Sequence, residues 1–302
     1  MRICSLFSTA TELLYALGAG HSVVGRSDCC DFPPGAIEKP IVVRSRIASD
    51  RLTSRGIHEA VQAMRRRGEH QYDIDVPLLR RLAPDLVVMQ ELCSVCAASH
   101  PEVSAALERL PTSPAVVSVN ARRFDELYHS IDALGQAIGK PHAAQRLTGR
   151  LRQEVRAIQK RLRHARARPR VWCVEWLDPL IAAGHWIPEL VALAGGRDGF
   201  GRAGHDSQRM SWDEVRRYDP EVILVMPCSF SIQRTISESS LLTTRSGWSN
   251  LSAVNAQRVF AVEGSFFHRP GPRLVKGLNL MAALFHPELF PPPPTSHARR
   301  LT

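Results

Sequence analysis

The sequence predicts an α/β protein with two Rossmann-like lobes, each built on a parallel sheet, joined by a long rigid helix. Two internal repeats support this fold class. Residues 80–89 (RRLAPDLVVM) and 216–225 (RRYDPEVILV) each combine a helix end, a Pro-acid turn and an apolar run typical of a buried parallel strand. Residues 11–20 and 188–196 each form a helix signal that follows a strand-like run and ends at glycine. Each half therefore repeats the strand and helix order of the other.

The repeats also predict the domain boundaries. We expect a first α/β lobe over 1–120, a connecting helical segment over 121–167 and a second α/β lobe over 168–290. The connecting segment holds the long helix near 143–166, which has apolar residues at helical spacing on one face and cationic residues on the rest. The chain end, 291–302, begins with four prolines and is expected to be disordered or extended.

Composition limits the class of protein and its compartment. The 302 residues are 44% hydrophobic and 23% charged, which is ordinary for a soluble globular chain. No apolar run reaches the roughly 20 residues that a membrane-spanning helix needs. An apolar alternating segment starts at residue 2, so no secretory leader is expected, and seven cysteines do not indicate an extracellular disulfide framework. We predict a cytoplasmic protein; the alternative is a periplasmic or surface-anchored protein whose leader has been removed.

The net charge of +10 raises the question of a nucleic-acid partner. Segment 143–168 carries nine basic residues against one acidic residue. No aromatic side chain is interleaved there to stack on bases. We interpret the segment as the solvated face of the connecting helix and predict no nucleic-acid partner.

The candidate ligand-binding residues follow the predicted strands. Ligands of open α/β sheets bind beyond the carboxyl ends of the strands, and two lobes that face each other would bring these ends to one cleft. The collected side chains suit a large ligand with an apolar body and polar edges. The predicted ligand-binding residues are Arg44, Arg46, Glu175, Trp176, His185, Trp186, Phe266, Phe267 and Arg269. No catalytic residue is predicted.

Some of these residues have a second interpretation. His185 is either a structural histidine that caps the next helix or a ligand contact, including an axial ligand of a metal. Trp186, Phe266 and Phe267 are either cleft aromatics or part of the core, and their positions in loops favour the cleft.

The cysteines divide into two groups. Cys4 and Cys173 lie inside strand-like runs and are expected to be small core residues. Four others follow strand ends and could form a tetrathiolate site for zinc or an iron–sulfur cluster: Cys30, Cys93, Cys96 and Cys228. The C-x-x-C spacing of Cys93 and Cys96 allows two thiolates to bind one metal ion. The alternative is four uncoordinated thiols that line the cleft. Cys29 has no assigned role.

Several short motifs carry a resemblance to a known family. They are residues 8–13 (STATEL), 31–34 (DFPP), 82–87 (LAPDLV), 184–190 (GHWIPEL), 211–215 (SWDEV) and 269–273 (RPGPR). Over most of 1–290 the chain resembles the cobalamin and iron–siderophore substrate-binding proteins of ABC importers. It is most similar to the leaderless branch known as cobalamin-binding proteins, with which it shares 92–96 (LCSVC) and 226–228 (MPC). The resemblance implies a helical-backbone substrate-binding-protein fold and a corrinoid or similar macrocycle in the cleft.

Two departures from the family pattern argue against docking on an ABC permease. Importer-coupled members carry one docking carboxylate on each lobe. Asp213 matches the position in the second lobe, whereas the first-lobe position falls near Pro77, with Asp75 close by. The second departure is the absence of a leader. In addition, Cys29 stands near the position of a stacking aromatic residue in the exported cobalamin binders.

The predicted function is the binding of cobalamin, or a related corrinoid or metal-macrocycle, in the cleft between the lobes, without turnover. The alternative is a cytosolic metalloprotein or redox enzyme that uses the four cysteines as zinc or iron–sulfur ligands in the same cleft. The predicted partner is a small-molecule macrocycle.

Overall fold

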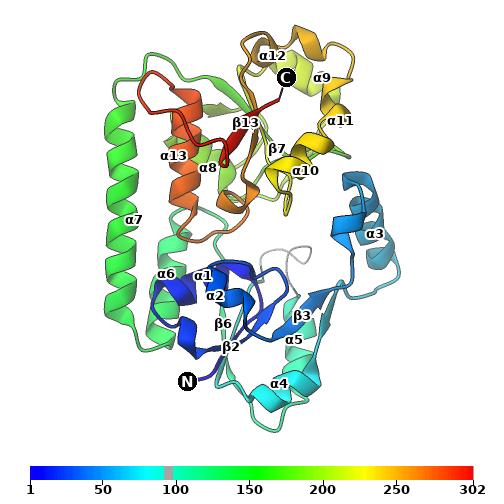
Figure 1. The fold of residues 1–302 in the computed structure, drawn as a ribbon, viewed down its shortest axis with the longest axis vertical. Helices are drawn as coiled ribbons and strands as arrows, with labels where there is room; N and C mark the ends of the chain where they lie inside the picture. The colour runs from blue at the N-terminus through cyan, green and yellow to red at the C-terminus, as the bar shows by residue number, and fades with distance from the viewer. Residues whose placement is uncertain (92–97, 302) are drawn as a thin grey trace. The chain divides into compact units, whose positions relative to one another are not determined.

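The fold is described from a computed structural model, in which residues 1–91 and 98–301 are placed (Figure 1). The chain divides into two compact units. Unit 1 comprises Met1–Leu52, Glu59–Ala121 and Asp125–Arg150, and unit 2 comprises Thr53–His58, Arg122–Phe124 and Leu151–Thr302. The units correspond to the two predicted lobes, with the connecting segment shared between them.

Unit 1 is built on a six-stranded sheet in the order β4-β3-β2-β1-β5-β6. Its strands are β1 (Ile3–Ser5), β2 (Val23–Ser27), β3 (Ile41–Ser45), β4 (Tyr72–Ile74), β5 (Leu86–Met89) and β6 (Ala115–Ser118). All neighbours pair in parallel except β3 and β4. Its helices are α1 (Ser8–Ala16), α2 (Pro34–Ile37), α3 (Ser54–Arg66), α4 (Val76–Leu82), α5 (His100–Leu107) and α6 (Glu126–Ala137). The first residues of α3 group with unit 2.

Successive side chains along the strands of unit 1 point to opposite faces of the sheet, and both faces are buried. Cys4 on β1 and Val87 on β5 point to one face, where they pack with Leu79 of α4 and Val103 of α5. The four residues of β5 are all buried. This burial on both faces explains why the strand reads as a continuous apolar run in the sequence.

Unit 2 is built on a sheet in the order β10-β8-β7-β11-β12-β13, with β9 paired to the start of β7. Its strands are β7 (Arg170–Trp176), β8 (Ile181–Ala182), β9 (Arg197–Asp198), β10 (Gln208–Arg209), β11 (Val222–Val225), β12 (Val259–Val262) and β13 (Ala298–Arg300). The central strands β7, β11 and β12 are parallel, whereas β8, β10 and β13 pair antiparallel. The sheets are therefore mixed at their edges and not purely parallel.

Helices cover both faces of this second sheet. They are α8 (Ile187–Leu193), α9 (Trp212–Tyr218), α10 (Ile232–Ser237), α11 (Ser240–Thr243), α12 (Ser252–Asn255) and α13 (Leu274–Phe285). Trp172 of β7 is fully buried and belongs to the core cluster that includes Val215 of α9 and Ala253 of α12. Val171, the preceding strand residue, lies on the other face with Phe285 of α13, beside Gly196.

The predicted repeat is confirmed in the turns that precede β5 and β11. Helix α4 ends at Ala83 with φ of 40°, and helix α9 ends at Asp219 with φ of 48°. Both residues adopt the left-handed conformation that commonly closes a helix, and a proline follows each of them. The same chain reversal therefore leads into the central strand of each unit.

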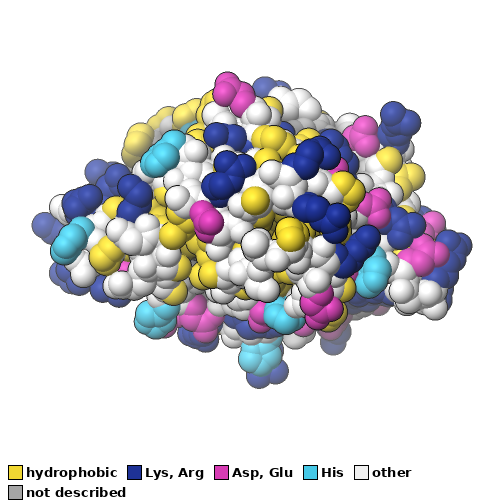
Figure 2. Space-filling view, turned by 90° about the horizontal axis from the view of Figure 1, so that it is seen from below, with side chains coloured by type: hydrophobic (Ala, Val, Ile, Leu, Met, Phe, Trp, Pro, Cys, Tyr) yellow, Lys and Arg dark blue, Asp and Glu magenta, His cyan; other side chains and the backbone are white. Residues whose placement is uncertain are grey.

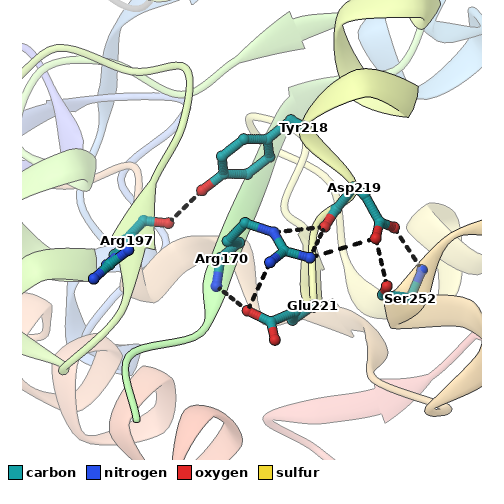
Figure 3. Close-up of polar contacts among 6 residues, drawn as sticks. All are labelled: Arg170, Arg197, Tyr218, Asp219, Glu221 and Ser252. Carbon is teal, nitrogen blue, oxygen red and sulfur yellow. Dashed lines mark hydrogen bonds and ion pairs between the residues drawn. The ribbon is translucent and has the colours of Figure 1, made fainter.

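The acid of each Pro-acid turn joins the two central strands at their amino ends. In unit 1, the backbone N–H of Arg2 donates to Asp85 over 2.7 Å. In unit 2, the backbone N–H of Arg170 donates to Glu221 over 2.8 Å, as shown in Figure 3. There the Arg170 guanidinium also contacts Asp219, whose carboxylate accepts from the Ser252 backbone over 2.7 Å. These contacts lie at the edge of the sheet opposite the carboxyl ends, so we assign them to structure.

The prediction of a disordered tail over 291–302 is wrong for its last described residues. β13 pairs antiparallel with β12, and the Leu301 N–H donates to the Val259 carbonyl over 2.9 Å. Ala298 is only 8% exposed. The outer edge of β12 presents unpaired backbone groups, and the tail supplies their partner.

The long connecting helix is present as α7 (Pro141–Leu162), which begins and ends somewhat earlier than predicted. Its apolar positions are buried: Leu147, Leu151, Val155 and Ile158. Among the described residues, none of the helices is both long enough and apolar enough to cross a bilayer.

Candidate functional site

A polar network lies at the carboxyl ends of the central strands of unit 2. Glu175, near the end of β7, accepts a short hydrogen bond from the Ser207 hydroxyl. The Gly184 N–H donates to Ser207 Oγ over 3.1 Å. His268, which follows β12, places Nδ1 3.8 Å from Glu175 Oε1, and its Nε2 contacts the carbonyl oxygen of Met226 after β11. Five separate chain segments therefore converge at this edge.

The environment of Glu175 favours its neutral form. Burial raises the pKa of this carboxyl, while hydrogen bonds from Ser207 and from the Gly184 backbone partly oppose the rise. The side chain keeps 21% exposure. The Glu175 carboxyl, the Ser207 hydroxyl and the His268 ring give this edge donors and acceptors that can pair with neutral polar groups such as amides.

The raised pKa of Glu175 predicts a pH-dependent stability difference. Above the ordinary glutamate value of 4.5, the folded state binds more protons at this group than the unfolded state does. Glu175 therefore contributes fully to folding stability below pH 4.5, and this contribution is lost as pH rises through the pKa of its carboxyl in the folded state. We expect Glu175→Gln to gain stability relative to the wild type as pH rises from 4 to 8, measured by thermal unfolding without ligand.

Glu214 provides a control of opposite sign, because hydrogen bonds from the Ser211 backbone and side chain lower the pKa of its carboxyl. The contribution of Glu214 to folding stability is present above the ordinary glutamate pKa of 4.5, and it is lost as pH falls through the pKa of the group in the folded state. The stability deficit of Glu214→Gln should therefore shrink toward acid pH. A stability difference between Glu175→Gln and the wild type that stays flat with pH would contradict the assignment.

His185 sits in a loop held by backbone pairing with a second loop. The residue has φ of 53°, its N–H donates to the His205 carbonyl over 2.6 Å, and its carbonyl accepts from Gly204 over 2.8 Å. Its Nε2 lies 3.2 Å from Asp206 Oδ1, which in turn accepts from Arg122 over 2.9 Å. Burial lowers the pKa of His185, and Asp206 opposes this effect. The helix-cap interpretation fits less well, because the N-cap residue of α8 is Trp186.

Three predicted cleft aromatics are buried inside unit 2. Trp186 is 6% exposed, Phe266 is 7% exposed and Phe267 is fully buried. The Trp186 indole N–H donates to the Phe267 carbonyl over 2.6 Å, which ties α8 to the segment after β12. These positions favour the core-packing alternative, because little of each ring remains accessible to a ligand.

Trp176 and Arg269 keep part of their surface accessible. The Trp176 indole N–H is shared between the carbonyl oxygens of Ser54 and Asp178, each at 3.1 Å. Its ring meets Phe230 edge-on, with 5.4 Å between centroids. Trp176 is therefore a half-buried aromatic surface held in a fixed orientation, and it remains a candidate ligand contact.

The candidate residues of unit 1 lie at the carboxyl edge of its own sheet. Arg44 is the penultimate residue of β3 and is exposed. Arg46 donates to the His70 carbonyl over 2.9 Å and lies 3.8 Å from an oxygen of Asp73. Cys30 is fully buried, and burial raises the pKa of its thiol well above the ordinary value. A neutral buried thiol is a weak nucleophile and must lose its proton to bind a metal.

The predicted tetrathiolate site stays a prediction. Cys93 and Cys96 lie outside the described residues. Cys30 belongs to unit 1 and Cys228 to unit 2, where its Sγ is 3.9 Å from Ser229 Oγ. Within 1–91 and 98–301, no group of three or more His, Cys, Asp or Glu side chains is arranged to hold a metal ion. Cys4 and Cys173 are buried in their strands, as predicted.

Sequence reasoning missed several members of the polar network. His268 lies in the same post-strand segment as Phe266 and Arg269, so its position could have indicated it. Ser207 and Asp206 precede a two-residue strand, which is too short to show a period of two. Arg122 comes from the connecting segment and carries no local signal.

The positions matched to docking carboxylates are equivalent in the two units. Pro77 and Asp213 are each the second residue of their helices, α4 and α9. Asp75 instead caps α4, because its carboxylate accepts from the Leu78 N–H over 2.8 Å. Asp213 is 79% exposed and borders an open cavity of about 710 Å³ with Arg216 and other residues. The carboxylate at this position is therefore present in unit 2 and replaced by proline in unit 1.

The chain is similar to known proteins along most of its length. The family model described as "Periplasmic binding protein" matches residues 3–264. The chain belongs to this family. A vitamin B12-binding protein of Vibrio cholerae is 26% identical over 281 residues, which cover 92% of this chain and 86% of the relative. An uncharacterized ABC transporter substrate-binding lipoprotein of Bacillus subtilis is 23% identical over 96% of this chain and 81% of its own length.

Solved structures of this family confirm the fold. A periplasmic heme-binding protein of Pseudomonas aeruginosa superposes with a TM-score of 0.73 and 20% identity, covering 100% of this chain and 99% of that chain. The periplasmic vitamin B12-binding protein of Vibrio cholerae gives 0.67 and 23% identity, covering 94% and 96%. The two-lobe α/β prediction with a long helix is thus correct.

Family membership supports the predicted class of binding protein. The chain is a member of the periplasmic binding protein family, and the proteins similar to it include a vitamin B12-binding protein and a heme-binding protein. The relatives are described as periplasmic or as a lipoprotein, so the cytoplasmic prediction gains no support.

Proposed function

We propose that this chain binds cobalamin or a related corrinoid and, as its similarity to an ABC transporter substrate-binding lipoprotein supports, serves an ABC importer even though Pro77 stands where the first-lobe docking carboxylate is expected. The observation that carries the proposal is the match to a vitamin B12-binding protein along 92% of the chain. The binding of heme by other family members is the main competitor, because the fold alone does not distinguish the two macrocycles.

The polar network of unit 2 supports a corrinoid over heme. A corrin ring carries uncharged amide side chains at its edge, whereas heme carries two anionic propionates. Glu175, with its raised pKa, together with Ser207 and His268 offers donors and acceptors with little positive charge. These groups can pair with amides, but they do not compensate a buried carboxylate.

His185 is the best candidate for contact with the metal of the ligand. Burial lowers the pKa of its imidazole, so the neutral form prevails at pH 7. Neutral imidazole is the form that binds transition metals. Its backbone pairing with the 204–205 segment fixes the position of the ring.

Titration of the purified protein with hydroxocobalamin, cyanocobalamin and heme, followed by absorbance, tests the proposal. We expect saturable binding of the cobalamins at a stoichiometry of one and weaker binding of heme. His185→Ala should weaken hydroxocobalamin binding by about tenfold, which corresponds to a loss of roughly 1.4 kcal/mol in binding free energy.

The matched control is His205→Ala, since His205 is an exposed histidine whose backbone, not its ring, pairs with His185. Its affinity for hydroxocobalamin should equal that of the wild type. Binding of heme without binding of any cobalamin would overturn the proposal and assign the chain to the heme-binding members.

A further inference from the structure

We propose that the exposed face of α7 binds the surface of an anionic phospholipid bilayer. This interaction is separate from ligand binding and rests only on the proposed role of the chain in an ABC importer, not on the identity of the ligand. It would concentrate the protein at the membrane that holds its importer.

The charge of α7 is confined to one side of the helix. The apolar residues Leu147, Leu151, Val155 and Ile158 are all buried against the protein. Every basic residue of the segment is exposed: Arg146, Arg150, Arg152, Arg156, Lys160, Arg161, Arg163, Arg166 and Arg168. At about 100° per residue, those within the helix cover about half of its circumference, opposite the buried stripe.

The row of basic side chains on α7 is long and is interrupted by almost no acidic residue. α7 has 22 residues, which corresponds to about 33 Å of helix. Glu154 is the one acidic residue between 141 and 168. Basic side chains also gather at the left of the surface in Figure 2, the side on which α7 lies in Figure 1. A row of cations on a straight helix matches the plane of phosphates that an anionic bilayer presents.

Several of the cations are already engaged in the fold, Arg150 and Arg152 among them. Arg161 lies 5.6 Å above the Phe290 ring, and Arg168 donates to the carbonyls of Ala192 and Gly196. The remaining cations include Arg146, Arg156 and Lys160 within α7 and Arg163 directly after its last residue. These four side chains form the set that a binding test should neutralise.

The mode of binding is electrostatic adsorption and not insertion. The apolar side chains of α7 are buried in the core, so the helix has no apolar face left to enter the acyl region of the bilayer. The exposed face has no aromatic side chain, and single-stranded nucleic acid is bound largely by stacking on such rings. Attraction of lysine and arginine to anionic lipid needs neither feature.

Co-sedimentation of the full chain with vesicles tests the proposal. The vesicles contain either phosphatidylcholine alone or phosphatidylcholine with about one-third phosphatidylglycerol. We expect binding to the anionic vesicles only, with a loss of affinity as salt is raised from 50 to 300 mM, about the range over which screening becomes strong. The quadruple variant R146Q/R156Q/K160Q/R163Q should bind at least tenfold more weakly, since each cation contributes about fivefold near the surface.

A second quadruple variant controls for net charge. R66Q/R81Q/R109Q/K276Q removes the same four charges from exposed positions outside α7 and should keep the wild-type affinity for anionic vesicles. Unfolding midpoints and ligand titrations of both variants separate membrane binding from folding and from the proposed cobalamin function. Equal loss in both variants, no binding to anionic vesicles, or tighter binding of duplex DNA at the same salt would each overturn the proposal.

Discussion

Replacing Gly184 by alanine is expected to weaken ligand binding by at least about tenfold and to lower the free energy of unfolding by about 1–3 kcal/mol. A Cβ atom at this position would lie 2.5 Å from the His205 carbonyl oxygen, 2.6 Å from the Ser207 nitrogen and 2.7 Å from the Asp206 carbonyl carbon. All three are backbone atoms, so the 205–207 segment has to move as a whole. The move separates Ser207 from Glu175, which breaks the polar network.

Gly149 is the matched control for this substitution. It lies in α7, and among the described residues no atom outside the adjacent helix backbone lies within 4 Å of the place that an added Cβ would take, so alanine meets no obstacle there. Gly149→Ala should raise stability by about 0.5–1 kcal/mol through the helix preference of alanine, with no change in ligand affinity. Urea unfolding and hydroxocobalamin titration measure both effects. If Gly184→Ala lowers stability but leaves affinity for every ligand unchanged, the network is not part of the binding site.

Trp172→Ala should lower the free energy of unfolding by about 3–5 kcal/mol, the largest loss of stability expected from a single site. Trp172 is fully buried at the centre of the unit 2 core. Its ring meets Phe200 at 6.3 Å and Trp212 at 6.4 Å between centroids. Removal of the indole leaves a cavity that these rings cannot fill without breaking other contacts.

Trp172→Phe separates packing from hydrogen bonding at the same site. The Trp172 indole N–H has no hydrogen-bond partner in the part of the chain that the structure describes. Phenylalanine keeps most of the apolar contacts and breaks no hydrogen bond. Trp172→Phe should therefore lower the free energy of unfolding by less than half as much as Trp172→Ala does. Circular dichroism during urea unfolding gives both values. Equal losses for the two variants would mean that the indole is stabilised by more than packing.

The strands that carry a strong local pattern could be predicted, and those without one could not. The apolar runs at 85–90 and 222–226 correspond to β5 and β11 within two residues. β8 and β10 each have two residues, which is too short for a period to be visible. β13 was missed because polar residues after a proline run resemble a disordered tail, yet the open edge of β12 binds them.

The residues of the candidate site also fall into some that could be predicted from the sequence and some that could not. Glu175 and His185 could be selected because both come after the apolar run at 171–174 in β7, and the structure places both in polar contacts. Trp186 and Phe267 were selected by the same rule, yet they are buried against each other. Position after a strand indicates the edge of the sheet, but it does not indicate whether a side chain points outward or into the core.

Local pattern in the sequence by itself determined the two-lobe α/β architecture, the repeated Pro-acid turns and the long amphipathic helix, because each depends on residues close together in the chain. Only the tertiary structure decided which side chains meet at the carboxyl edge of unit 2. Glu175 and Ser207 are 32 residues apart, and His268 is more distant still. Their contact depends on strand order and loop course, which arise from packing across the whole unit and leave no periodic trace in any one segment.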